Sequence, residues 1–150
     1  MGLAKLRAFL KRHRKVALDT NVFIYQLEDN PQYSILTDHI FGWLAKENSS
    51  AVTSTITMTE LLVQPYRKSD QSLADRYYGL LSTFPNLTWI APGLEIADIA
   101  ARLRELHRFR TPDALQAATA VFAGATAMIT NDAVFERVEA FETVVLDSYL

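Results

Sequence analysis

Four acidic residues stand where expected strands end or expected helices begin, and they are the strongest candidates for chemistry in this sequence. They are Asp19, Glu60, Asp113 and Asp132. Carboxylates gathered in one place repel one another and raise one another's pKa, so such a cluster is best tolerated when a cation neutralises it. Oxygen ligands without histidine or cysteine favour a hard ion, Mg²⁺ or Mn²⁺. Such an ion activates water and stabilises charge on a phosphate, which suits phosphodiester hydrolysis.

Each of these acids, taken alone, also has a purely structural explanation. Asp19 and Asp132 fit the N-cap of a helix, and Asp113 fits the positive end of a helix dipole. Glu60 is compatible with an ordinary exposed position on a helix. The hypothesis of a shared site therefore depends on a fold that brings all four together.

The elements that must position these acids alternate along the chain. Expected strands cover residues 16–18, 51–54, 88–91, 127–130 and 143–146. Expected helices begin at Asn30-Pro31, near Ile56, near residue 70, after Pro92-Gly93 and at Thr111-Pro112, and a short helical turn covers 132–138. Strands that alternate with helices predict right-handed crossovers and a parallel sheet. The predicted fold class is α/β: a three-layer α/β/α sandwich with a mostly parallel five-stranded sheet.

The carboxyl edge of this sheet is where the four acids are expected to meet, because ligands of open parallel sheets bind there. Asp19 directly follows the first strand, and Asp132 lies two residues after the fourth. Glu60 is early in the helix that leaves the second strand. The helix over 112–124 feeds the fourth strand through a very short link, so its first turn, with Asp113, is predicted to lie at the same edge.

Charge is distributed unevenly along the 150 residues, a length that fits one domain. Residues 1–15 carry six Lys or Arg and no acid, whereas residues 16–150 have a net charge of −8. We therefore divide the chain into a basic N-terminal leader, expected to be helical, over 1–15 and the main domain over 16–150. The leader suits a polyanion, but an amphipathic helix with Leu3, Leu6 and Leu10 on one face is the favoured interpretation.

Several classes of protein are disfavoured by composition and missing motifs. The absence of cysteine excludes disulfides, thiolate metal sites and cysteine nucleophiles, and it suits a reducing cytoplasm. The uncharged segment 114–131 is rich in alanine and threonine and is interrupted by Gln116, so a buried helix and strand fit it better than a membrane span. We expect a soluble, cytoplasmic protein. A P-loop, a serine nucleophile elbow and an HExxH motif are absent, and a haloacid-dehalogenase-like phosphatase needs an acid where Asn21 stands.

Four short motifs resemble those of a known family. They are VALDTNV at 16–22, TMTEL at 57–61 with Glu60, PDALQAA at 112–118 with Asp113, and TND at 130–132. In this order and at this spacing they closely resemble the PIN-domain nucleases, and the nearest group is the VapC-type toxins of toxin–antitoxin pairs. The resemblance extends from about residue 16 to residue 146. The basic leader is a departure, since many such toxins begin almost at the first strand.

The resemblance implies a PIN-like fold and a Mg²⁺- or Mn²⁺-dependent endoribonuclease. It implies that Asp19 and Asp113 are the principal metal ligands and that Glu60 and Asp132 complete the cluster and orient water. Supporting polar positions are Asn21, Thr130 and Asn131. The family also implies a homodimer and a small antitoxin protein that blocks the site.

Cations near the expected edge are candidates for binding RNA phosphates. Arg108 and Arg110 lie just before Asp113, and Arg67 and Lys68 follow the helix of Glu60. Cations near helix C-termini are also favoured by the helix dipole, so this assignment has a structural alternative. Two other functions stay open: a PIN-fold nuclease of RNA processing without an antitoxin, and a non-catalytic PIN-fold binding module. The charge repulsion among the four acids argues against the second, and the RNA target and the number of metal ions stay open.

Overall fold

Five parallel strands form one sheet in the computed structural model, which describes residues 2–46 and 48–150. The strand order is β3-β2-β1-β4-β5. The strands are β1 (Lys15–Leu18), β2 (Ser50–Ser54), β3 (Leu87–Ile90), β4 (Ala127–Thr130) and β5 (Glu142–Val145). Every pair of neighbours is parallel. The predicted five-stranded sheet is confirmed, and it is parallel throughout.

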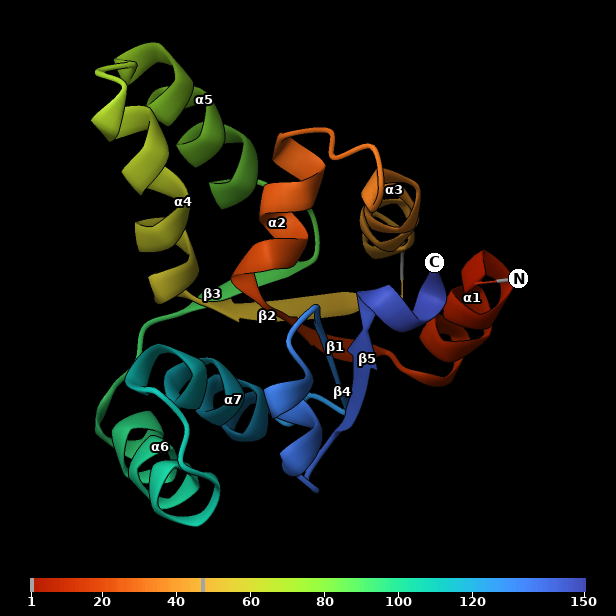
Figure 1. Ribbon diagram of the computed structural model, residues 1–150, viewed down its shortest axis with the longest axis vertical. Coiled ribbons are helices and arrows are strands. Elements are labelled where there is room, and N and C mark those ends of the chain that lie inside the picture. Colours follow the sequence, from red (N-terminus) through yellow and green to blue (C-terminus); the bar gives the residue numbers. More distant parts are fainter. Residues whose placement is uncertain (1, 47) are drawn as a thin grey trace.

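Helices cover both faces of this sheet and give the predicted three layers (Figure 1). On one side lie α1 (Gly2–Arg12), α2 (Thr20–Leu27), α3 (Ser34–Leu44), α4 (Thr55–Arg67) and α5 (Gln71–Ser82). On the other lie α6 (Leu94–His107), α7 (Thr111–Ala123) and the 3-10 turn η1 (Ala133–Arg137), and a second such turn, η2 (Leu146–Tyr149), ends the chain. Because both faces are covered, the strands are apolar at successive positions: Val16 and Leu18 belong to one core and Ala17 to the other.

The order of the strands creates a switch point between β1 and β4. The chain leaves β1 toward β2 and β3, then crosses to the other side of β1 for β4 and β5. Leu18 and Ile129 are in register at the ends of the two central strands, and the N–H of Asp19 donates to the carbonyl of Ile129 over 3.0 Å. An open parallel sheet has its natural binding crevice at the carboxyl edge beside such a switch point.

The main differences from the predicted elements concern four helices, while strand ends differ by about one residue. The helix α2 was not predicted, because its short run of apolar residues lacks a clear helical period. The helix expected at Asn30-Pro31 begins later, at Ser34, since the Asn30 side chain accepts from the N–H groups of Gln32 and Tyr33 and forms a turn first. Helix α4, which was expected to cover about residues 56–63, continues through Pro65 to Arg67. Thr111 lies inside α7 and not at its cap.

The basic N-terminal stretch forms a helix that packs on the rest of the protein. Leu6, Phe9 and Leu10 of α1 are buried in the same core as β1 and α3, and Leu3 packs against its border. Met1 lies outside the described residues. The leader helix thus contributes buried side chains to one of the two hydrophobic cores. Among the described helices, none has both the length and the apolar character that crossing a membrane requires.

Candidate active site

Asp19 lies at the centre of the carboxyl edge, immediately after β1 and at the N-cap of α2. Its side chain is 8 % exposed. One carboxylate oxygen accepts from the N–H of Thr20 at 2.8 Å and the other from the hydroxyl of Thr130 at 2.7 Å. The pKa of Asp19 is raised from 3.8 to about 6, mainly by burial and to a smaller extent by the charges of Asp113 and Glu60, while the two hydrogen bonds oppose the shift.

Asp113 and Asp132 occupy the starts of α7 and η1. Asp113 is in the first turn of α7, and Asp132 caps η1 by accepting from the N–H of Val134 at 3.0 Å. Burial raises the pKa of Asp113, and the charges of Asp132 and Glu60 act in the same direction. Arg110, whose Nε lies 3.8 Å from Asp113 Oδ2, opposes this shift. All four predicted acids are therefore linked by repulsion that acts on Asp19 and Asp113.

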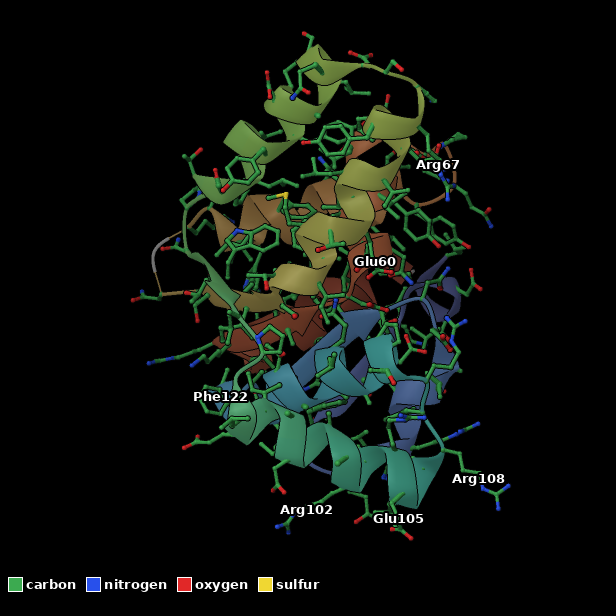
Figure 2. All side chains as sticks on the ribbon, turned by 90° about the vertical axis from the view of Figure 1, so that its left-hand side faces the viewer. Glu60, Arg67, Arg102, Glu105, Arg108 and Phe122 are labelled. Carbon is green, nitrogen blue, oxygen red and sulfur yellow. The ribbon has the colours of Figure 1, made fainter. Side chains whose placement is uncertain are left out.

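Glu60 extends from the second turn of α4 and is exposed at the same site. Its carboxylate accepts a hydrogen bond from the hydroxyl of Thr20 at 2.7 Å. Thr20 directly follows Asp19 in the chain, so this one residue of α2 connects Asp19 with Glu60. Figure 2 shows Glu60 on α4 near the middle of the side that faces the viewer.

A buried polar network beneath Glu60 fixes the direction of this hydrogen bond. Thr53 donates to the carbonyl of Leu18 at 2.9 Å, so the hydroxyl contact of 2.8 Å between Thr57 and Thr53 must use the proton of Thr57. The amide nitrogen of Gln116, which only donates, lies 2.7 Å from the Thr57 hydroxyl and 3.3 Å from that of Thr20. Both hydroxyls, themselves 3.2 Å apart, accept from Gln116, and Thr20 is left to donate to Glu60.

This network was missed by the sequence analysis. Thr20, Thr53, Thr57 and Gln116 are all buried, and Gln116 is only 3 % exposed. A single amide inside the apolar run of α7 was the available signal, because a buried polar side chain needs partners. It was interpreted only as an interruption of a possible membrane span.

The three predicted supporting residues have different surroundings. The Thr130 hydroxyl donates to Asp19 and accepts from the N–H of Asp132 at 3.0 Å, so it connects two of the four acids. Asn131 points its amide elsewhere, donating to the Tyr25 hydroxyl at 3.1 Å and accepting from the N–H of Asp147 at 2.8 Å. The Asn21 Oδ1 atom is buried and has no hydrogen-bond partner within residues 2–46 and 48–150.

The candidate RNA-binding cations lie at different distances from the acidic residues. Arg110 lies beside Asp113, as described above. Arg108 is the left-handed C-cap of α6 (φ 58°), and in Figure 2 it extends outward at the lower edge of the molecule, well below Glu60. Just after the C-terminal end of α4, Lys68 lines a small hollow of about 60 Å³ together with Glu60. Arg67, the last residue of α4, is at the upper right of Figure 2, above Glu60.

The donor set fits a hard divalent cation in its chemistry. It includes the carboxylates of Asp19 and Asp113, whose pKa values are raised. Within the described residues, no three acidic or histidine side chains stand close enough to ligate one ion. Mg²⁺ does not need such a cage, because it keeps several waters and binds through one or two carboxylates plus a substrate phosphate.

Comparison with known proteins assigns the chain to a family. Residues 16–140 match the PIN domain, and the chain belongs to that family. Helix α1 lies before the matched span. A comparison with curated proteins found no match.

Solved structures with the same fold share little sequence with this chain. VapBC-1 from nontypeable Haemophilus influenzae has a TM-score of 0.69 and 21 % identity, with 89 % of this chain and 98 % of that chain covered. A toxin–antitoxin complex from Klebsiella pneumoniae has a TM-score of 0.67 and 20 % identity, with 87 % and 97 % covered. VapBC2 from Rickettsia felis, bound to a DNA fragment from its promoter, has a TM-score of 0.66 and 17 % identity, with the same coverage.

The raised pKa of Asp19 predicts how stability depends on pH without metal. The folded protein holds the Asp19 proton up to about pH 6, whereas an unfolded chain releases it near 3.8. Stability therefore falls as the pH rises through this window, by about 2 kcal/mol between about pH 4.5 and pH 7.5. Asp19→Asn removes this loss, so the variant gains on the wild type at the higher pH. Urea unfolding in chelator at both pH values measures the difference. An equal difference at the two values would contradict the shift.

The directed network predicts energetic coupling between Gln116 and Thr20. Gln116→Met removes both donors and leaves buried hydroxyl oxygens unsatisfied, at a cost of about 1–3 kcal/mol. Thr20→Val alone has a similar cost, and the double variant is expected to show a coupling energy of about 1 kcal/mol. Thr119→Val is the matched control, because Thr119 is equally buried on α7 but bonds only to the carbonyl of Leu115. Additive costs for Gln116 and Thr20, measured by urea unfolding, would show that the network does not act as a unit.

Proposed function

We propose that the protein is a Mg²⁺- or Mn²⁺-dependent endoribonuclease and the toxin of a toxin–antitoxin pair of the VapC type. Membership of the PIN-domain family supports a nuclease. The similar structures include VapBC and toxin–antitoxin complexes, which supports a small antitoxin as partner. The observation that supports it most is that the charges of Asp113 and Glu60 act on Asp19, and those of Asp132 and Glu60 act on Asp113.

The four acids have distinct roles in this proposal. Asp19 and Asp113 would hold the ion, since both have carboxylates whose protonation is already favoured by burial and by neighbouring charge. When bound, the ion supplies an activated water and neutralises charge on the scissile phosphate. Glu60, fixed by the Thr20 hydroxyl, and Asp132, fixed at the start of η1, would complete the cluster and orient the water.

Cations of the chain compensate the charge that RNA adds. Arg110 lies beside Asp113, and Lys68 lines the same hollow as Glu60. We propose that they hold phosphates adjacent to the one that is cleaved, because Lys and Arg supply the phosphate contacts of nucleic-acid-binding proteins. A homodimer is also proposed, on the strength of the family resemblance.

Substitution of the proposed ligands provides the direct test of catalysis. Purified protein is expected to cleave single-stranded RNA in Mg²⁺ or Mn²⁺ and to lose the activity in excess chelator. Asp19→Asn and Asp113→Asn are each expected to lower the cleavage rate on the order of 100-fold or more, because each removes charge stabilisation from the reacting site. Asp98→Asn is the control, since Asp98 is an exposed partner of Arg102 on α6.

The outcome separates the proposal from its two alternatives. Full activity of either ligand variant, or activity in chelator, would contradict metal-dependent catalysis by these acids. A protein that binds RNA but does not cut it with any divalent ion would be a binding module. An active protein without a small antitoxin reading frame beside its own would instead be a nuclease of RNA processing.

A further inference from the structure

A basic hollow lies between α1 and α3, apart from the acidic edge. It has a volume of about 370 Å³. Its cations are Arg7 and Lys11 from α1 and Lys46 just after α3, and its apolar lining includes Leu10, Gly42 and Trp43. The two helices pack side by side (Figure 1). None of these residues belongs to the candidate active site, and α1 lies outside the span that matches the PIN domain.

The positive charge of this hollow is fixed in place and only partly compensated. Arg7 Nε donates to His39 Nε2 at 2.8 Å, so that nitrogen of His39 is an acceptor and its ring is neutral. Burial lowers the pKa of His39, and the charges of Arg7 and Lys46 lower it further. A neutral partner orients the guanidinium without neutralising it, and the other guanidinium N–H groups stay available.

Acidic groups do not offset these cations. Within the described part of the chain, Asp38 is the one acidic residue that lines the hollow. Its Oδ1 accepts from Gln26 Nε2 at 2.7 Å, which ties it toward α2. The hollow is therefore lined by three cations and one acid, and Arg7, Lys11 and Lys46 are all exposed.

The shape and the aromatic lining indicate what kind of anion fits. Trp43 is half-buried, so part of its indole faces the hollow. Gly42 is exposed beside it, and a Cβ at that position would meet no atom within 4 Å, so the absence of a side chain keeps the space open. Proteins that bind single strands combine cations that follow the phosphates with aromatic rings on which bases stack. An acidic peptide would use the cations but not the indole.

We propose that the hollow between α1 and α3 binds a phosphate and an adjacent base of single-stranded nucleic acid. Arg7, Lys11 and Lys46 contact the phosphate, and Trp43 stacks on the base. The choice of ligand rests in part on the proposed function, because a strand that extends beyond the acidic edge needs a second place of attachment. The hollow itself is defined by residues that the proposed catalysis does not use.

The first arm of the test blocks the hollow without changing its charge. The probes are labelled uridine and thymidine decanucleotides in excess chelator, so that no cleavage is needed. Binding is followed by anisotropy and, in a Trp89→Phe background, by the fluorescence of Trp43, the remaining one of two tryptophans. Gly42→Phe is expected to weaken binding about tenfold, the order of loss for one stacked base, and to abolish quenching. Gly79→Phe is the control, because Gly79 is also an exposed helical glycine with open space around it.

The second arm changes the charge and leaves the shape. Lys11→Met is expected to lower the slope of log affinity against log salt by about 0.7, the value for one lost phosphate contact with a single strand. Lys5→Met removes the same charge from the same helix outside the hollow, and it is expected to leave the slope nearly unchanged.

Three results would overturn the proposal. Equal effects of Gly42→Phe and Gly79→Phe would show that the hollow is not occupied, and so would equal effects of Lys11→Met and Lys5→Met. If a polyglutamate peptide, and not the oligonucleotides, were sensitive to Gly42→Phe, the ligand would be an acidic protein segment. Both arms are measured in chelator and therefore do not depend on catalysis. A protein that does not cleave RNA can still bind the oligonucleotides in the hollow, and an active nuclease can lack this binding.

Discussion

The fold has to hold several negatively charged carboxylates, one of them almost fully buried, at the carboxyl edge of the sheet. Asp19 is almost fully buried, and its pKa is raised to about 6 although two hydrogen bonds favour its ionised form. Asp113 is shifted in the same direction by burial and by the charge of Asp132. At neutral pH the burial of these ionised carboxylates, with a smaller contribution from neighbouring negative charges, lowers the stability of the metal-free protein, so a bound cation would stabilise it.

The fold opposes this repulsion through its topology and through fixed hydrogen bonds. The switch point places β1 beside β4, and α2 and α7 begin at the same edge, where the positive ends of their dipoles favour carboxylates. Beneath the edge, Thr57 donates to Thr53, both Thr57 and Thr20 accept from the amide of Gln116, and Thr20 donates to Glu60. The Thr130 hydroxyl connects Asp19 with the backbone of Asp132 in a similar way. Buried polar residues of α2, α4, α7, β2 and β4 thus hold the acids in place at the carboxyl edge.

The sequence predicted the architecture well because the strands are short apolar runs with clear ends. The placement of Asp19 and Asp132 followed directly from where β1 and β4 stop, and that of Asp113 followed from the short link between α7 and β4. Helix α2 was missed because eight mainly apolar residues have no strong helical period, and tertiary packing decides their conformation. The role of Gln116 could not be predicted, because its partners come from residues 59 and 96 positions away. The helical character of α1 followed from the spacing of Leu3, Leu6 and Leu10, whereas its packing on the core and the hollow beside Gly42 and Trp43 depend on how α1 and α3 lie together.

Direct measurement of divalent-ion binding in the absence of RNA tests the central claim most closely. The electron paramagnetic resonance signal of free Mn²⁺ decreases as the ion binds to protein. We expect a saturable decrease with the wild type, reversal by Mg²⁺, and weakening of about tenfold or more in the Asp113→Asn protein, because the negative charge of a proposed ligand is lost. Equal Mn²⁺ binding by the wild type and that variant, or no binding by either, would contradict it.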